Sequence, residues 1–251
     1  MHISELIESV SESIDKIDTS KYKFKVLKAR DLKLLTRICL ENNKFEFNGK
    51  LYKQIIGAPM GGTLSPTCTD LHLAKLLTEI LKQFKNKNNI KLHCQYRDDG
   101  FMCYEGEENE IINFFEIANN IHPLLKFTYE IAETCITYLD TEVYKGKRFE
   151  EMKILDIKSH IKKTETFQYL PTSSAHPKHT FKNIIIGETK RHIRNNNNKE
   201  DLDKIISMLE EKLIDRGYDR RLVSDTIIET TNTKNRIDLL KEKPKTTKIP
   251  I

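Results

Sequence analysis

The chain has 251 residues, with 42 Lys and Arg against 37 Asp and Glu, a formal net charge of +5 at pH 7. Its apolar share of 38% is low for a globular protein but too high for a fully disordered one. No run of 18 apolar residues occurs, which excludes a membrane-spanning helix, and Glu5 and Glu8 interrupt the N-terminal apolar positions, so we expect no secretory signal. The five cysteines form no CxxC pair, which favours reduced thiols in an intracellular protein of the nucleus or cytoplasm, neither secreted nor bound to a membrane.

Positive charge is concentrated in the C-terminal part of the chain. Residues 1–143 hold 18 basic and 21 acidic side chains, whereas residues 144–251 hold 24 basic and 16 acidic ones. A local excess of this size can attract a polyanion such as a nucleic acid. An ordinary solvated surface rich in lysine explains the excess equally well.

The first predicted elements are two amphipathic helices, over about 3–17 and 29–42, because apolar residues recur at helical spacing in both stretches. The period then changes: Phe45 and Phe47 alternate with polar residues, and Asn48-Gly49 predicts a tight hairpin turn. The segment GAPMGGTLSP, at 57–66, predicts a loop with unusual backbone angles. Pro66 is expected in the first turn of the helix that follows.

The next predicted element is a hairpin that carries two adjacent carboxylates. Apolar and polar residues alternate in KLHCQY and in FMCYE, which predicts two strands. These strands flank RDDG, so we expect Asp99-Gly100 to form a two-residue turn. Asp98 and Asp99 would then lie at or beside the hairpin tip. Neighbouring like charges are unfavourable in a strand unless they are solvated or bind a cation, and for an isolated DDG a solvated turn is the simpler interpretation.

The C-terminal half predicts strands and then helices. A helix is expected over 107–121, followed by strands at KFTYEIA, CITYLDTEVY, MKILDI and TFQYL. After Ser173 the pattern becomes helical, with one amphipathic helix that ends at Arg216-Gly217 and another expected over 219–229. The last residues, KEKPKTTKIPI, form a basic tail that is poor in apolar residues.

Two motifs about 30 residues apart, GAPMGGTLSP and then YRDDGF, resemble the palm of reverse transcriptases. The stretches FEFNGKLYKQIIGAPMGGTLSP, ITYLDTEVY and TFQYLPTSSAHPKHTFKNIIIGE are similar to the reverse transcriptases of Penelope-like retroelements. The resemblance implies an α+β fold, a palm-type antiparallel sheet with helices on one face followed by a mainly helical thumb. It divides the chain into a helical lead-in (1–43), a palm (44–172), a thumb (173–240) and a mobile basic tail (241–251).

The resemblance implies RNA-directed DNA synthesis, with dNTP as the nucleotide and an RNA template, an RNA–DNA hybrid or a DNA duplex as partner. Nucleotidyl transfer uses two divalent ions, and Mg²⁺, which Mn²⁺ can replace, prefers oxygen ligands. Asp98 and Asp99 would be the catalytic, metal-binding residues. The implied nucleotide-binding residues are Gln54, Gly57, Met60, Gly61, Gly62 and Lys126. The implied nucleic-acid-binding residues are Tyr96, Phe167, Tyr169, His176, Lys178, His179, Lys182 and Arg191.

These residues also have simpler interpretations. Aromatic residues such as Tyr96 and Phe167 more often pack in a core than stack on bases. His176 and His179 are three residues apart, but no Cys or acid follows at zinc-ligand spacing, so a surface or phosphate contact is favoured.

The chain also departs from the resembled family. The family's first catalytic strand, with its own Asp, is absent before Lys44, and Arg97 adds a cation beside the two aspartates. Because two carboxylates on one turn are too few for two Mg²⁺ ions, we expect a palm-and-thumb fragment with little or no activity alone. One alternative is a non-enzymatic nucleic-acid-binding remnant of a retroelement. Another is an unstable truncated product with an exposed sheet edge.

Overall fold

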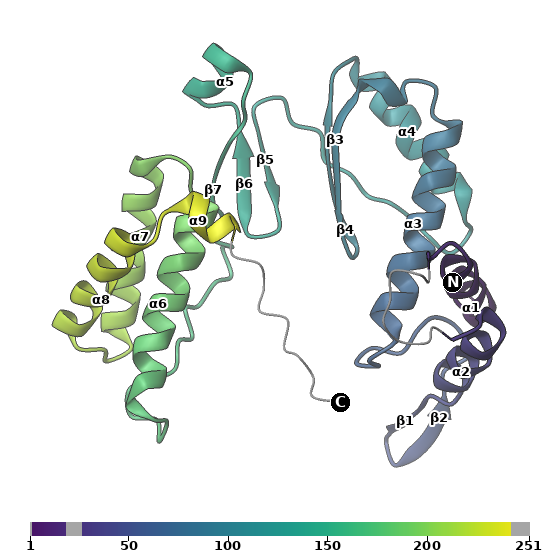
Figure 1. Cartoon of the computed structure of the whole chain (residues 1–251), viewed down its shortest axis with the longest axis horizontal. Coiled ribbons are helices and arrows are strands. Elements are labelled where there is room, and N and C mark those ends of the chain that lie inside the picture. The colour runs from purple at the N-terminus through teal and green to yellow at the C-terminus, as the bar shows by residue number, and fades with distance from the viewer. Residues whose placement is uncertain (1, 19–26, 242–251) are drawn as a thin grey trace. The chain divides into compact units, whose positions relative to one another are not determined.

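The computed structural model describes residues 2–18 and 27–241 (Figure 1). The chain forms two compact units, Met1–Ile131 and Ala132–Ile251. This division falls inside the stretch 44–172, and the lead-in, palm and thumb bounds stay a prediction. The expected mobile tail lies, apart from Lys241, outside the described residues.

The first unit begins with three packed helices, α1 (Ile3–Asp15), α2 (Ala29–Glu41) and α3 (Ser65–Gln83). As predicted, Pro66 occupies the first turn of α3, where its missing N–H costs no helical hydrogen bond. The amphipathic pattern of α1 buries Leu6 and Ile7 against Leu40 of α2 and Cys68 of α3. This core fixes the N-terminal half of α3 beside α1, an arrangement visible in Figure 1.

Two hairpins belong to the first unit. Strands β1 (Lys44–Phe47) and β2 (Lys50–Lys53) pair around Asn48-Gly49, where both residues have positive φ, as the predicted turn requires. Strands β3 (Ile90–Tyr96) and β4 (Asp99–Tyr104) pair with Tyr96 opposite Asp99, so the two-residue turn is Arg97-Asp98. The prediction of Asp99-Gly100 as the turn is wrong, because Arg97 itself adopts a left-handed φ of 57° and Asp99 already belongs to the ladder.

A second core of the first unit lies between the C-terminal half of α3 and helix α4 (Glu108–Ile121). Ile80 and Phe84 pack on Phe114 and Ala118, and the short helix η2 (Lys87–Asn89) leads into the β3–β4 hairpin. Helix α4 lies within the predicted range 107–121. The stretch KFTYEIA that follows it is irregular instead of a strand, and Phe127 packs against this core from outside any ladder.

The second unit starts with a three-stranded antiparallel sheet of β5 (Cys135–Tyr138), β6 (Thr141–Tyr144) and β7 (Asp156–Ser159), with β6 in the centre. The short helix α5 (Lys147–Met152) connects β6 to β7. CITYLDTEVY and part of MKILDI are therefore strands, as predicted. TFQYL is irregular, which contradicts its prediction as a strand.

The described part of the second unit from 178 to 241 is mainly helical, as the sequence predicted. It comprises α6 (Lys178–Asn195), α7 (Lys199–Asp215), α8 (Arg220–Thr233) and α9 (Arg236–Lys241). Their shared core contains Ile185, Leu209, Leu213, Tyr218, Val223 and Ile227. The α+β class predicted from the sequence is confirmed, with the described strands in three separate antiparallel sheets.

Candidate nucleic-acid interface

The most distinctive local structure of the second unit is a helix, a short turn and a second helix, formed by α7, residues 216–219 and α8 (Figure 1). Helix α7 ends where the N–H of Gly217 donates to the carbonyl of Ile214 at 2.9 Å and that of Tyr218 to Leu213 at 3.2 Å. Gly217 has a φ of +87°, a conformation that favours glycine. Asp219 then caps α8 by accepting a hydrogen bond from the N–H of Leu222 at 2.9 Å. A four-residue turn with a glycine is typical of helix-turn-helix units.

Apolar packing fixes the angle between these helices. Leu213 at the end of α7, Tyr218 in the turn and Val223 in α8 are almost fully buried against Ile185 of α6. The Tyr218 ring meets Phe181 of α6 edge to face, with ring centroids 5.8 Å apart. Helix α6 therefore serves as the third helix of the unit and supports both helices of the motif.

The segment before α6 also holds the turn in place. The Arg216 guanidinium donates to the carbonyl oxygen of Tyr169 at 3.0 Å and to the side chain of Gln168 at 3.2 Å. The hydroxyl of Thr172 donates to the carbonyl oxygen of Gly217 at 3.0 Å. These bonds satisfy polar groups at the end of α7 and connect residues 168–172 to the helix-turn-helix.

The surface of α8 mixes charged and apolar side chains. Arg220 and Arg221 are exposed in its first turn, and Leu222 and Ile228 are also exposed, by 39% and 56%. Further along, Glu229 forms an ion pair with Lys182 of α6 at 3.2 Å. The N-terminal end of α8 is thus its most positive part.

The basic residues predicted to bind nucleic acid fall into two groups. His176, Lys178 and His179 are exposed around the start of α6. Lys182 is held by Glu229, and Arg191 donates to Asp140 at 3.0 Å and lies 3.4 Å from Glu188. The bond to Asp140 connects α6 to the β5–β6 turn, so this guanidinium has a structural role in addition to any contact with a ligand.

The two aromatic residues predicted beside these basic ones are packed against the helices. Tyr169 packs on the helical core, and its burial raises its pKa to about 12. Phe167 has a φ of 50°, and the Lys212 ammonium lies 5.8 Å from the centre of its ring. Neither ring lies in a strand, because TFQYL is irregular.

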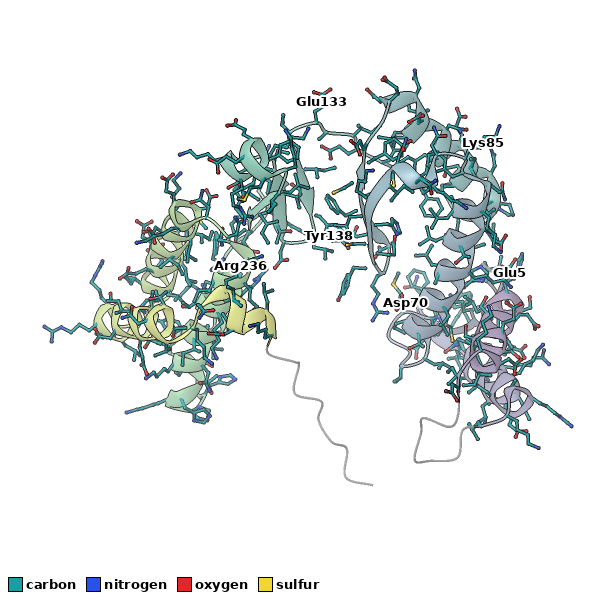
Figure 2. The ribbon with its side chains drawn as sticks, turned by 45° about the horizontal axis from the view of Figure 1, so that its top comes forward. Glu5, Asp70, Lys85, Glu133, Tyr138 and Arg236 are labelled. Atoms are coloured by element: carbon teal, nitrogen blue, oxygen red, sulfur yellow. The ribbon has the colours of Figure 1, made fainter. Side chains whose placement is uncertain are left out.

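In the first unit, Asp98 and Asp99 are exposed at the β3–β4 tip, and the neighbouring Tyr96 is 60% exposed. The Arg97 guanidinium donates to the carboxylate of Asp70, labelled in Figure 2, at 3.2 Å. This contact places the hairpin tip beside the first turns of α3, which the glycine-rich segment precedes. Within the described residues, the two aspartates belong to no cluster of three metal-ligating side chains, whereas Glu5, His72 and His122 do form one.

The residues predicted to bind a nucleotide lie in separate parts of the first unit. Gly57, Met60, Gly61 and Gly62 are in the irregular segment before α3, where Met60 is fully exposed. The amide of Gln54 donates to the carbonyl oxygen of Ile56 at 2.9 Å and shapes this segment. The Lys126 ammonium donates to the carbonyl oxygen of Asn119 at 2.8 Å, so it hydrogen-bonds the last turn of α4.

A family model described as the animal helix-turn-helix domain matches residues 168–228. No curated protein and no solved structure matches the chain. The matched range contains the segment that binds Arg216, helices α6 and α7, the glycine turn and α8 as far as Ile228. This finding corrects the family expectation: the assignment to a Penelope-like reverse transcriptase domain is wrong, because the part interpreted as its thumb matches a helix-turn-helix domain instead.

The match bears on the predicted partners as well. It supports nucleic acid as the partner class, while the RNA template, the dNTP and the particular duplex stay predictions.

Among the described residues, none of the helices combines the length and apolar character that crossing a bilayer requires. The sequence contains the signals for the motif, namely Gly217 after an amphipathic helix and Asp219 before the next one, but these signals alone do not distinguish it from a helical thumb.

Proposed function

We propose that the chain binds duplex DNA through α7 and α8, with α8 as the helix that enters the major groove. The observation that carries this proposal is the glycine turn at 216–219, which joins two helices within the range that matches a helix-turn-helix domain. In such motifs the second helix lies in the groove and its N-terminal residues contact base edges.

The first turn of α8 suits that role. Arg220 and Arg221 are exposed there, and arginine is the side chain that most often makes specific contacts, through two hydrogen bonds to guanine. The exposed Lys178 and His179 at the start of α6 can add phosphate contacts, which increase affinity without reading sequence. Duplex DNA is a better fit than duplex RNA, because the major groove of A-form RNA is too narrow for side chains to read.

Fluorescence anisotropy of labelled duplex DNA with the full chain tests the proposal. Replacing both arginines, Arg220→Gln with Arg221→Gln, is expected to weaken binding by about 1–3 kcal/mol for each arginine that hydrogen-bonds to a base. An arginine that pairs with a phosphate would instead, on removal, reduce the slope of log K against log salt by about 0.9. The matched control is Lys162→Gln with Lys163→Gln, which removes the same charge from exposed residues outside the matched range.

The two double variants separate a specific interface from general attraction to positive charge. If both weaken binding equally, α8 is not the reading helix and only the net charge matters. If the wild-type chain binds duplex DNA no better at low salt than at high salt, the proposal fails entirely. Preference for duplex RNA over duplex DNA would also contradict it.

A second candidate function, metal-dependent nucleotidyl transfer at the β3–β4 tip, is favoured by one specific contact. Arg97 reaches Asp70, so the tip with Asp98 and Asp99 lies next to the helix that follows the glycine-rich segment. Template-dependent primer extension by the purified chain with Mg²⁺ or Mn²⁺ tests this candidate. Extension that disappears with Asp98→Asn and persists with Glu46→Gln, a change on a different hairpin, would support it. No extension would leave DNA binding as the function.

A further inference from the structure

Three potential metal ligands converge in the first unit, and none of them belongs to either site described above. Glu5 lies in the first turn of α1, His72 lies in α3, and His122 directly follows α4. One ligand atom from each lies within 4.8 Å of the other two. Figure 2 labels Glu5 where α1 runs beside α3, so the cluster joins helices that are far apart in the sequence.

His72 is arranged like a ligand that lacks its ion. Its side chain is 5% exposed, and its Nδ1 lies 2.8 Å from the hydroxyl oxygen of Ser9. That hydroxyl donates its own hydrogen to the carbonyl oxygen of Glu5 at 3.0 Å, so the hydrogen between Ser9 and His72 belongs to Nδ1. The other ring nitrogen, Nε2, then carries a lone pair, and this atom is buried without a hydrogen-bond partner.

An unpartnered buried nitrogen is costly, and the ring that carries it is clustered with a carboxylate and a second imidazole. Metal-bound histidines commonly donate their other ring N–H to an oxygen, which fixes the ring orientation. Ser9 provides that oxygen for His72. Burial lowers the pKa of His72, which favours the neutral ring.

Glu5 and His122 provide the other two ligands. Burial opposes ionisation of Glu5, but hydrogen bonds from the His2 backbone and from His122 together lower its pKa, so it is a carboxylate. Its Oε2 accepts from the His2 N–H at 2.7 Å, and its Oε1 lies 3.1 Å from His122 Nε2. The Nδ1 of His122 accepts from the N–H of Leu124 at 3.2 Å, so without an ion Nε2 donates its proton to Glu5.

We propose that Glu5, His72 and His122 form a binding site for Zn²⁺ or a similar first-row divalent ion, with water in the remaining position. Two imidazoles and one carboxylate suit Zn²⁺, whereas Mg²⁺ and Ca²⁺ prefer oxygen ligands alone. The ion takes the place of the proton between His122 and Glu5. That proton moves to Nδ1, so the hydrogen bond from the Leu124 N–H is released. The bound ion connects α1, α3 and the end of α4.

Titration of the untagged full chain with Zn²⁺ or Co²⁺, after treatment with a chelator, tests the site. The expected result is one ion per chain, with a Co²⁺ absorption spectrum typical of mixed nitrogen and oxygen ligands. Removing a supporting hydrogen bond commonly weakens metal binding by about 10–100-fold, so Ser9→Ala should weaken it to that extent and Glu5→Gln by at least as much. The control is His176→Gln with His179→Gln, which removes two exposed histidines of the second unit and should leave binding unchanged.

Hydrogen exchange gives a second, independent measurement. Binding should slow exchange in α1 because the ion holds Glu5, while the Leu124 amide should exchange faster because its bond to His122 is released. No stoichiometric binding at roughly 0.1 mM metal would overturn the proposal and leave the cluster as a hydrogen-bond network. Binding that disappears in the His176 and His179 double variant but persists in Glu5→Gln would overturn it as well.

Discussion

His192 makes the stability of the second unit dependent on pH. Its side chain is 5% exposed at the junction of α6 and β7, with its Nδ1 3.0 Å from the hydroxyl oxygen of Ser159. Burial lowers its pKa from 6.5 to about 4, with a further contribution from the neighbouring Arg191 and opposition from Asp140. Because this pKa lies below that of the unfolded chain, the neutral ring stabilises the fold at neutral pH.

The size of the effect follows from these two pKa values. Below pH 6.5 His192 is protonated in the unfolded chain, whereas in the folded chain it stays neutral until the pH approaches 4. Lowering the pH from 6.5 to 4 therefore favours unfolding. Between pH 7.5 and pH 5.0 the stability decreases by about 2 kcal/mol, because each pKa unit corresponds to 1.36 kcal/mol. This corresponds to roughly a 30-fold decrease in the equilibrium protection of α6.

Hydrogen exchange of peptides from 178–195 in the full chain measures this protection, after correction for the intrinsic pH dependence of exchange. The matched variant is His192→Gln, which retains a polar side chain but cannot be protonated in this range. Its protection is expected to vary with pH much less than that of the wild type. Equal pH dependence in both proteins would refute the assignment of the effect to His192.

Three further substitutions probe the second unit. Gly217→Ala should destabilise it by about 1–2 kcal/mol, because an L residue is strained at φ +87° and its Cβ would lie 2.8 Å from the Thr172 hydroxyl; an unchanged melting temperature would contradict this. Leu209→Ala at the 1% exposed core position should cost about 2–5 kcal/mol in chemical denaturation, and a loss below 1 kcal/mol would show that the core is loosely packed. Arg148→Met leaves the buried Asp156 carboxylate without its guanidinium partner and should cost about 1–3 kcal/mol, less if Asn197 compensates.

Local patterns in the sequence predict most of the helices and hairpins. These patterns involve only residues that are close in the sequence. They are the period of 3.6 in α1, α3 and α7, the Asn48-Gly49 turn and Pro66 at the start of α3, and the structure contains each of them. The prediction for KFTYEIA is wrong because its aromatic residues pack on α4 as side chains of an irregular segment: Tyr129 stacks on Phe115 with ring centroids 4.2 Å apart. A single sequence does not distinguish that packing from a strand.

The candidate sites show the same difference between local and long-range information. The helix-turn-helix signals at Gly217 and Asp219 are local, so the sequence predicts the helix end and the next helix start, although the resemblance assigns them to another family. The cluster of Glu5, His72 and His122 is not predicted, because its members are 67 and 50 positions apart and share no motif spacing. Only the packing of α1 on α3 and the end of α4 brings them together.

The bonds from Arg216 and Thr172 bear on where an autonomous folding unit begins. A fragment starting at Lys178 would contain every helix of the motif yet lack the Tyr169 carbonyl oxygen that Arg216 requires and the hydroxyl that satisfies Gly217. The turn between α7 and α8 would then lose both bonds to the preceding segment, and α8 would have greater freedom to reorient. The smallest piece that preserves the orientation of that helix therefore has to include about ten residues that lie outside any helix.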